Sequence, residues 1–505
     1  MAKIERTKNT VTGAVWGIIE KIANIFLPFL VRTILINKLG SEYLGLSSLF
    51  SSILQVLNLT ELGFGTASVF AMYKPIAEDD YSKVGAFVQY LKKIYRYIGI
   101  ITFGLGILFL PFIRSIISGS VPSDINVYIL YLIYLVNTTL SYMLFAYKTA
   151  LLSALQLNHI TSKVNLVSNS IMHIVQIAAL LVYPNYYVYV LLIPLFTIIS
   201  NFTKLSIVDR KYKKWLGIGC LSEDDKKSIT TRLFPLISTK LAVVLVNSAD
   251  TIVISAFIGL TEVAIYNNYY YIMTSVCGFL IVAYGAMQAG IGNSLVIDNK
   301  DKIYKDYTKF SFINYWIITI CTTCLVTLYQ PFMEIWVGPK LMLDFKMVIL
   351  FGMYFYSQTA FRISVVYKDA SGIWKNDMAR CYASCILNLI INIITVRYWG
   401  LYGVIGSSVF VGMFVDPIII RNVHKFVFEI PAKKSYMALI KNIIITVGVS
   451  CICVNVCEFI PVSFIGLLAR ACVCVLICIV VLYAFYYKDN NFSDAKIWIL
   501  GKLKK

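Results

Sequence analysis

Three polar side chains and a proline lie on one face of the first long apolar segment of the chain. Lys21, Asn24, Pro28 and Arg32 follow one another at helical spacing, so an α-helix brings them onto one stripe. A cation at mid-membrane depth costs about 3 kcal/mol on insertion scales, so it should face either a partner or a wet cavity. In such a cavity, ammonium and guanidinium groups would bind an anionic group in place of water.

A second set of polar side chains follows 219 residues further along, on the corresponding face of another apolar segment. Lys240, Asn247 and Thr251 share this face, and Lys240 aligns with Lys21. A rise of 1.5 Å per residue puts both lysines roughly 15 Å into their segments, near the bilayer midplane. The predicted cavity residues are Lys21, Asn24, Arg32, Lys240, Asn247 and Arg362.

Several ionisable side chains are candidates for coupling to an ion gradient, because burial and nearby cations shift the pKa values of such groups. These candidates are Glu20, Asp250, His173, Glu61 and Asp416. His173 lies on a third polar stripe, which also carries Asn169 and Gln176. The alternative to a cationic cavity is internal ion pairing, in which Glu20 neutralises Lys240 across the interface between two lobes. Arg32 could instead extend outward to the membrane surface, and His173 could be a hydrogen-bonded packing residue.

The elements that must position these side chains are membrane-spanning helices. Of the 505 residues, 59% are hydrophobic and 14% are charged, a balance that excludes a soluble protein. The apolar residues form runs of roughly 20 to 30, the length that crosses a bilayer core as helix. Hydropathy predicts about 14 spans, among them 43–71 and 343–367, and therefore an all-α polytopic membrane protein. The first span is longer than a signal-peptide core and is predicted to be retained.

The distribution of positive charge predicts the orientation of the chain. Most of the 45 Lys and Arg fall on segments that share one side if the N-terminus is cytoplasmic. This asymmetry predicts that both termini are cytoplasmic. The net charge of +19 is then explained by loops that face anionic membrane lipids, and no nucleic-acid partner is predicted.

Other chemistries find little support in the sequence. All 12 cysteines follow residue 219 and lie among Val, Ile and Leu, which favours packing over metal ligation. No phosphate-binding G-x-x-x-x-G-K-[ST] loop is present, so direct use of ATP is not expected. The three histidines lie on distant spans, so no enzyme is predicted. No cofactor is predicted, although a proton or sodium gradient would supply energy.

An internal repeat organises the chain. "EKIANIFLPFLVRTILINKLG" (20–40) aligns with "TKLAVVLVNSADTIVISAFIG" (239–259), so that Gly40 meets Gly259, and one inserted residue brings Glu42 onto Glu262. Both copies begin on the same side of the membrane, which predicts two six-helix lobes in a parallel repeat with the substrate between them. The predicted parts are an N-lobe (1–208), a cytoplasmic loop (209–228), a C-lobe (229–430) and a final segment (431–505) with two spans and a cytoplasmic tail.

The stretch "VRTILINKLGSEYLGLSSLFSSILQVLNLTELGFGTASVFAMYKPIAEDD" (31–80) resembles the beginning of bacterial polysaccharide-transport proteins, the O-antigen and capsule-repeat flippases. The resembling residues are Arg32, Leu39, Gly40, Glu42, Tyr43, Gly45, Leu46, Glu61, Leu62, Gly63, Tyr73 and Pro75, with Asp250 and Tyr266 in the second hairpin. The family belongs to the multidrug/oligosaccharidyl-lipid/polysaccharide exporter superfamily. The resemblance implies two lobes that move a polyprenyl-diphosphate-linked oligosaccharide to the outer leaflet, with polymerase and chain-length proteins as further partners.

Three other functions are weighed against this one. An ion-coupled drug or metabolite antiporter of the same fold would be expected to line its cavity with acidic and aromatic groups. A lipid II flippase would have the same number of spans. A membrane enzyme of polysaccharide synthesis would need large extramembrane loops or an acid/base cluster, and the sequence offers neither.

Overall fold

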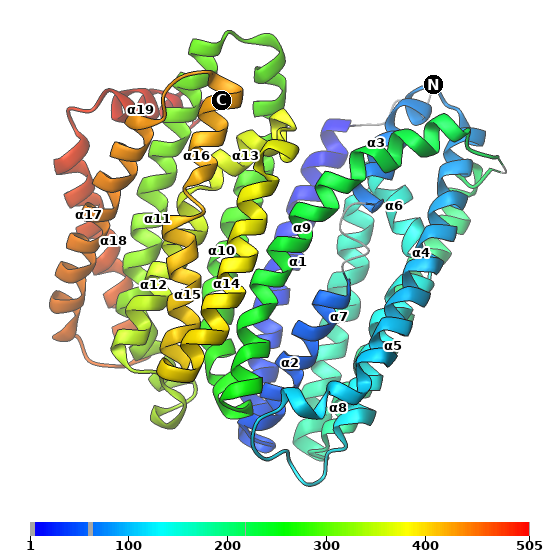
Figure 1. Cartoon of the computed structure of the whole chain (residues 1–505), viewed down its shortest axis with the longest axis horizontal. Helices are drawn as coiled ribbons and strands as arrows, with labels where there is room; N and C mark the ends of the chain where they lie inside the picture. The colour runs from blue at the N-terminus through cyan, green and yellow to red at the C-terminus, as the bar shows by residue number, and fades with distance from the viewer. Residues whose placement is uncertain (1–5, 59–63, 218, 504–505) are drawn as a thin grey trace. The chain divides into compact units, whose positions relative to one another are not determined.

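The structure is a computed structural model that describes residues 6–58, 64–217 and 219–503. Nearly all of these residues lie in helices or in the turns between helices (Figure 1). The predicted all-α membrane fold is confirmed. The chain divides into two compact units, Met1–Ala264 and Ile265–Lys505. The boundary between the units falls inside α10, and the lobe boundaries proposed from the sequence stay a prediction.

The first unit contains α1 (Arg6–Lys38), α2 (Ser41–Leu57), α3 (Phe64–Ala77), α4 (Tyr81–Phe109), α5 (Val127–Met143), α6 (Ala146–Ala154), α7 (Asn158–Val182), α8 (Tyr186–Lys211), α9 (Glu223–Phe257) and the start of α10 (Leu260–Ile297). Its hydrophobic core gathers around Leu35, Phe50 and Tyr131. The buried tyrosines keep their hydroxyls bonded, because an unpaired buried donor is costly. Tyr131 donates to the carbonyl of Gly106 at 3.1 Å.

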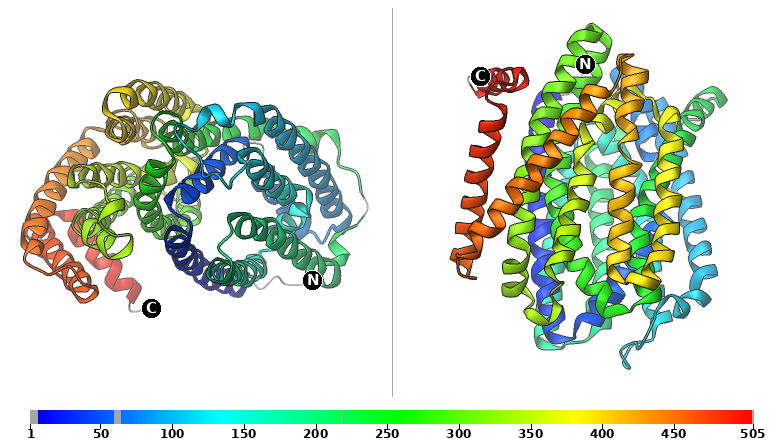
Figure 2. Two further views of the ribbon diagram at one scale, coloured as in Figure 1. Left: turned by 90° about the horizontal axis from the view of Figure 1, so that it is seen from below. Right: turned by 60° about the vertical axis from the view of Figure 1, so that its left-hand side comes forward.

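The second unit contains α11 (Lys300–Trp336), α12 (Phe345–Ala360), α13 (Arg362–Ser371), α14 (Trp374–Trp399), α15 (Leu401–Phe414), α16 (Ile418–Val423), the π-helical turn η6 (His424–Phe428), α17 (Lys433–Glu458), α18 (Phe464–Tyr486) and α19 (Asn490–Leu503). One of its cores is aromatic and gathers around Tyr307, Tyr367 and Phe428. Figure 2 shows α17 and α18 as neighbouring helices at an edge of this unit, where both pack on α11.

Eleven described helices are long and apolar enough to cross a membrane, or up to twelve if the bent pair α5 and α6 is one span. The predicted count of about 14 is therefore not confirmed, and two predicted spans account for the difference from twelve. In place of 343–367 the structure has α12 and α13, of 16 and 10 residues, each too short to cross alone. In place of 43–71 it has α2 and α3, and residues 59–63 between them lie outside the described residues.

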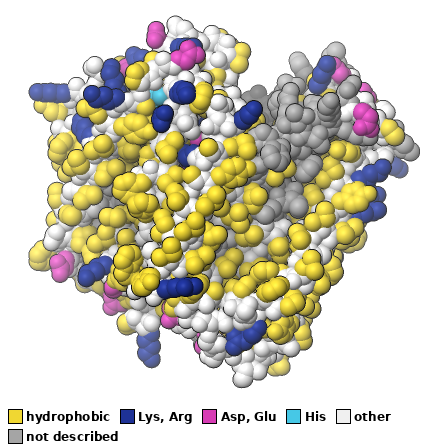
Figure 3. All heavy atoms as spheres, viewed as in Figure 1, with side chains coloured by type: hydrophobic (Ala, Val, Ile, Leu, Met, Phe, Trp, Pro, Cys, Tyr) yellow, Lys and Arg dark blue, Asp and Glu magenta, His cyan; other side chains and the backbone are white. Residues whose placement is uncertain are grey.

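The outward faces of the long helices are apolar. On α1, Val15, Ile18, Ile22, Phe26 and Leu30 are exposed and follow one helical stripe. On the face of the molecule that Figure 3 shows, hydrophobic side chains cover most of the helix surfaces, and the Lys and Arg side chains lie mainly near helix ends. This arrangement matches helices that meet lipid in their middle and water at their ends.

The turn that recurs in the sequence recurs in the structure. Gly40 has a φ of 118° and Gly259 a φ of 148°, a backbone region that side chains with a Cβ rarely adopt. Each glycine N–H donates to the same relative position, the carbonyl of Leu35 at 3.3 Å or of Ile254 at 3.0 Å. The two copies of the hairpin therefore end their first helix with the same capping geometry.

The two copies of the hairpin also touch each other within the first unit. α2 packs on α9, and Gly45 of α2 lies against the start of α10. A Cβ built on Gly45 would come 2.2 Å from the carbonyl oxygen of Leu260. Only glycine permits this approach, because the obstructing atom belongs to the backbone.

A helix break recurs as well. α5 and α6 meet at a bend of 46° next to Phe145, and α12 and α13 meet at Phe361. Just after each break a Tyr-Lys pair carries a buried lysine: Lys148 is 6% exposed and Lys368 is 7% exposed. These lysines are 220 residues apart, the offset that aligns Glu42 with Glu262. The repeat therefore extends beyond the hairpin in which the sequence first indicated it.

Candidate functional site

A ladder of polar side chains joins α1 to α7. Asn165 donates from Nδ2 to Oε1 of Glu20 at 3.0 Å, and one turn further along Asn169 donates to Oδ1 of Asn24 at 3.2 Å. The residue numbers increase together along both helices, so the two helices run parallel. Figure 2 shows α1 and α7 side by side. The predicted stripes of the two spans therefore meet at Asn24 and Asn169.

The ladder is continued by α8. Lys204 of α8 lies close enough to Glu20 for their charges to attract. Beyond Asn169, His173 is bonded through Nδ1 to Oε1 of Gln176 at 2.9 Å, and Gln176 donates to the carbonyl of Tyr189 at 3.2 Å. The polar groups thus form a continuous seam, which we call the α1–α7 seam, inside helices whose outer faces are apolar. Buried polar groups in a membrane are usually paired in this way or mark a pathway.

Lys21 and Arg32 lie beside this seam. Successive side chains of an α-helix point in directions that differ by about 100° around the helix axis. The direction of Lys21 therefore lies between that of Glu20, which faces the α1–α7 seam, and that of Ile22, which is exposed, so Lys21 lies on the flank of α1. Within the described residues, Lys21 forms no hydrogen bond or ion pair. Arg32, two to three turns further along, lies near Tyr189 of α8. The predicted stripe thus carries two cations next to an amide and carboxylate ladder.

The second predicted stripe lies on α9, which belongs to the first unit. Lys240 and Asn247 are partly buried there, whereas Asp250 is 1% exposed. In the described part of the chain, Glu20 accepts from Asn165 and lies near Lys204, and its pairing with Lys240 stays an alternative.

In the second unit, Arg362 stands at the break between α12 and α13. Its Nε donates to the carbonyl of Gln358 at 3.0 Å, and its charge lies near Cys277 and Tyr284 of α10. Tyr284 in turn donates to Oδ1 of Asn314 at 2.6 Å. The side chain of Arg362 therefore lies inside the unit, between α10 and α12. Asn314 of α11, the partner of Tyr284, is the next polar side chain along this path.

Asp416, a predicted ion-coupling residue, belongs to a buried charge network. Its Oδ1 accepts from Nη1 of Arg380 at 2.6 Å and from Ser384 at 2.8 Å. Arg380 also forms a two-pronged pair with Asp377, at 2.8 and 2.7 Å. Lys368 lies 3.8 Å from Asp377, which is fully buried. Asp416 thus has a permanent cationic partner.

Some residues of the site were not predicted. Asn165 and Lys204 were missed, although Asn165 is one turn before Asn169 and the four-residue spacing would have indicated it. Lys148 is buried and paired with Asp209 at 2.5 Å, and the sequence did not indicate this pair. Glu61, a predicted ion-coupling residue, lies outside the described residues.

The cysteines of the last two spans act as small packing residues. Cys453, Cys457, Cys474 and Cys478 are fully buried where α17 meets α18, and the Sγ atoms of Cys457 and Cys474 are 3.8 Å apart. Over the described residues, no group of three or more His, Cys, Asp or Glu side chains is arranged to hold a metal ion. The chemistry of the site is therefore that of charges and amides.

Comparisons with known proteins agree with this architecture. Residues 10–288 match a family model described as polysaccharide biosynthesis protein. No curated protein matches the sequence. Among solved structures, the lipid II flippase MurJ in an inward closed conformation is 15% identical, covers 95% of this chain and 99% of its own, and gives a TM-score of 0.68.

Two multidrug transporters are also similar in structure. An inward-facing MATE family transporter of the MOP superfamily is 14% identical over 86% of this chain and 99% of its own, with a TM-score of 0.61. A mutant of the Vibrio cholerae MATE transporter VcmN is 14% identical over 84% and 99%, with a TM-score of 0.55. At these identities the likeness establishes the fold.

Proposed function

Because the chain belongs to the polysaccharide biosynthesis protein family, we propose that it moves polyprenyl-diphosphate-linked oligosaccharide repeat units from the cytoplasmic to the outer leaflet. The product would be a surface polysaccharide such as O-antigen or capsule. The proposed location is the bacterial inner membrane, with both termini cytoplasmic. The proposed mode is alternating access to a polar, positively charged path.

The architecture supports translocation rather than synthesis. Nearly all the described residues belong to helices, and eleven or twelve of these helices or helix pairs can cross a membrane. A polysaccharide biosynthesis protein that consists mainly of membrane helices is suited to the step in which a lipid-linked intermediate crosses the bilayer. The fold shared with a lipid II flippase supports the same step.

The observation that carries the proposal is the α1–α7 seam with Lys21 on its flank. A diphosphate-sugar head group moved through hydrocarbon without partners would cost tens of kcal/mol, about the penalty for an unpaired ion in a low dielectric. Amide groups at Asn24 and Asn169 would replace hydrogen bonds of the sugar to water. Lys21 would attract the diphosphate, while the polyprenyl chain would stay in lipid.

Two substitutions test the proposal. We expect Lys21→Ala and Lys240→Ala each to reduce the amount of lipid-linked oligosaccharide that reaches the outer leaflet, and the double variant to reduce it further. Lys211→Ala is the matched control, because Lys211 is exposed at the end of α8. Membrane abundance of each variant is measured in parallel. Transport at the wild-type rate in the double variant would contradict the proposed cationic path.

Glu20 is the proposed ion-coupling group. In Glu20→Gln the amide oxygen still accepts from Asn165, whereas the negative charge near Lys204 is lost. We expect this variant to retain cargo binding and to lose the dependence of transport on a proton or sodium gradient. A gradient dependence equal to that of the wild type would assign the coupling to another group, with Asp250, His173, Glu61 and Asp416 as the remaining candidates.

An alternative cargo is favoured by the structural likeness to MurJ and the MATE transporters. The chain would then be a lipid II flippase or an ion-coupled drug or metabolite antiporter. Proteoliposomes distinguish these functions, because each cargo can be offered separately to the purified protein. Transport of lipid II or of a drug, without transport of the oligosaccharide carrier, would replace the proposed function.

A further inference from the structure

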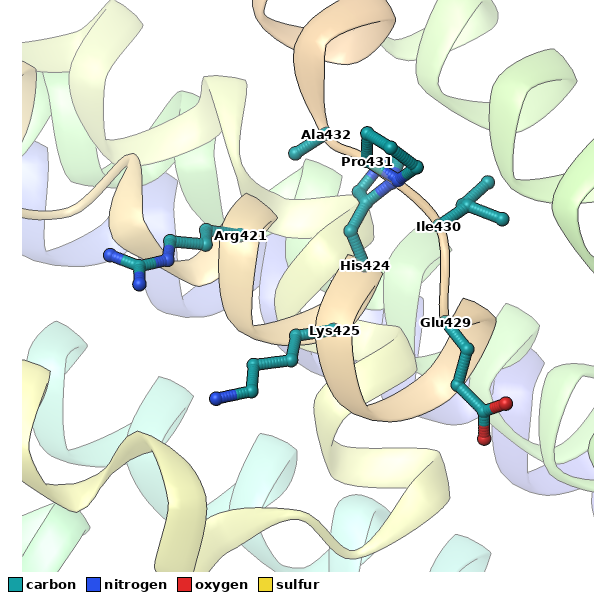
Figure 4. A pocket seen from close by; sticks show the side chains of 7 residues that line it. All are labelled: Arg421, His424, Lys425, Glu429, Ile430, Pro431 and Ala432. Carbon is teal, nitrogen blue, oxygen red and sulfur yellow. The ribbon is translucent and has the colours of Figure 1, made fainter.

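A pocket of about 450 Å³ lies in the second unit, where α16 and η6 lead into α17. Its lining is Arg421, His424, Lys425, Glu429, Ile430, Pro431 and Ala432 (Figure 4). The candidate span Leu401–Phe428 ends here and the next one begins at Lys433. The pocket therefore lies at the level where the helices leave the membrane, and no part of it belongs to the α1–α7 seam.

The pocket combines positive charge with an apolar wall. Arg421 and Lys425 are exposed, are one helical turn apart, and extend in the same direction in Figure 4. Glu429 points away from them and is paired through Oε2 with Nζ of Lys300 at 2.6 Å. The carboxylate is thus neutralised by a lysine outside the lining, which leaves a net positive pocket. The apolar wall consists of Ile430, Pro431 and Ala432.

A buried imidazole supplies a further polar group. His424 lines the pocket, is 1% exposed, and is held through Nε2 by Ser435 at 2.9 Å. Its Nδ1 has no hydrogen-bond partner in the described part of the chain, which is unusual for a buried polar atom.

The backbone around this histidine is irregular. His424 begins a π-helical turn, and Glu429, which ends it, has a φ of 60° although it is not glycine. Single π-helical turns occur often at functional sites, and a non-glycine residue in the left-handed region is a strained conformation. Two irregular backbone features, the π-helical turn and the left-handed residue Glu429, thus lie at the pocket, and both support a binding role for it.

We propose that this pocket binds the phosphate-bearing head group of an anionic membrane lipid. Arg421 and Lys425 would hold the phosphate, and the apolar wall would contact the first part of the lipid chain. Basic pockets where membrane helices meet the surface suit such head groups. Two further lysines, Lys433 and Lys434, follow the lining directly and add positive charge to the same surface. The proposal does not depend on the cargo of the transporter.

The test is lipid binding to the purified full-length protein in neutral detergent. Four ligands are titrated separately: phosphatidylglycerol, phosphatidylcholine, a polyprenyl monophosphate and inorganic phosphate. We expect the two anionic lipids to bind more tightly than phosphatidylcholine. A basic residue near a membrane surface contributes about fivefold in affinity, so Arg421→Gln/Lys425→Gln should weaken anionic-lipid binding about 25-fold.

Two further variants separate a specific pocket from general charge attraction. Lys211→Gln/Lys213→Gln removes two exposed charges in the first unit and should leave the affinity nearly unchanged. Ala432→Phe keeps every charge but fills the pocket, so it should also weaken binding.

The preferred lipid identifies the source of the phosphate. Tighter binding of phosphatidylglycerol assigns the pocket to bulk phospholipid, and tighter binding of the polyprenyl phosphate assigns it to the carrier lipid. Equal affinity for phosphatidylcholine, equal loss in the two double variants, or equal affinity for inorganic phosphate would overturn the proposal.

Discussion

Arg380→Gln tests the charge network of the second unit. The guanidinium of Arg380 meets both carboxylate oxygens of Asp377, which is 0% exposed, and it also holds Asp416 at 2.6 Å. Glutamine is too short and has too few donors to replace this fork. The substitution therefore leaves a buried carboxylate with Lys368 at 3.8 Å, Asn422 at 2.9 Å and the weakly donating Cys381 thiol at 3.6 Å.

The expected loss follows from these remaining partners. Breaking a buried ion pair by removal of one partner typically costs 3–5 kcal/mol, because the other charge stays buried without compensation. Asp377 keeps one distant cation, one amide donor and one thiol donor, so we expect the lower end of this range, about 3 kcal/mol. The measurement is denaturant unfolding of the purified full-length protein in detergent, followed by helical circular dichroism.

Two further variants make this prediction refutable. Arg210→Gln removes an exposed arginine and should change the free energy of unfolding by less than about 0.5 kcal/mol. In Asp377→Asn/Arg380→Gln no charge of the pair is left alone, so the double variant should be more stable than the sum of its single variants predicts. The reasoning fails if Arg380→Gln unfolds like the wild type, or if the effects of the two substitutions simply add.

Two other predictions concern the stability of the first unit. Gly45→Ala should destabilise the protein by about 1–3 kcal/mol or more, because the new Cβ would lie 2.2 Å from the carbonyl oxygen of Leu260; an unchanged melting temperature would show that α2 does not approach α10 so closely. For the ion pair between Lys148 and Asp209, the side chains are 7% and 45% exposed, so Asp209→Ala should cost more than Lys148→Met. The first variant leaves a buried ammonium unpaired, whereas the second leaves a carboxylate that reaches water, and the opposite order of melting temperatures would contradict this account.

Sequence reasoning predicted the features that depend on local physical chemistry. Long apolar runs become helices because every backbone group must be satisfied inside the membrane. The recurrence of a turn at Gly40 and Gly259 was visible because glycine is needed for the backbone conformation found there. The stripe of Lys21, Asn24 and Arg32 was visible because helical spacing is a property of the sequence.

Features that depend on tertiary contacts were not predictable. The chain leaves the helix at Phe361 without a glycine or proline at that position, so hydropathy gave one continuous span there. Lys148 lies near the end of a predicted span, where a lysine is usually solvated. Its burial depends on the distant Asp209, and the pairing of Glu20 with Asn165 depends on how α1 packs on α7.

The internal repeat explains why its two copies keep the same backbone features but differ in their polar side chains. Both copies need a glycine at the hairpin turn, and both bury a lysine after a helix break, because these features determine how the helices follow one another. The copies differ at polar positions that the hairpin turn does not require: Pro28 aligns with Asn247, and Arg32 aligns with Thr251. The partners of the buried lysines differ as well. Lys148 has one half-exposed aspartate, whereas Lys368 lies in a network with two aspartates nearby. The two copies of the repeat therefore share a backbone framework and would present different hydrogen-bonding and charged groups to the proposed cargo.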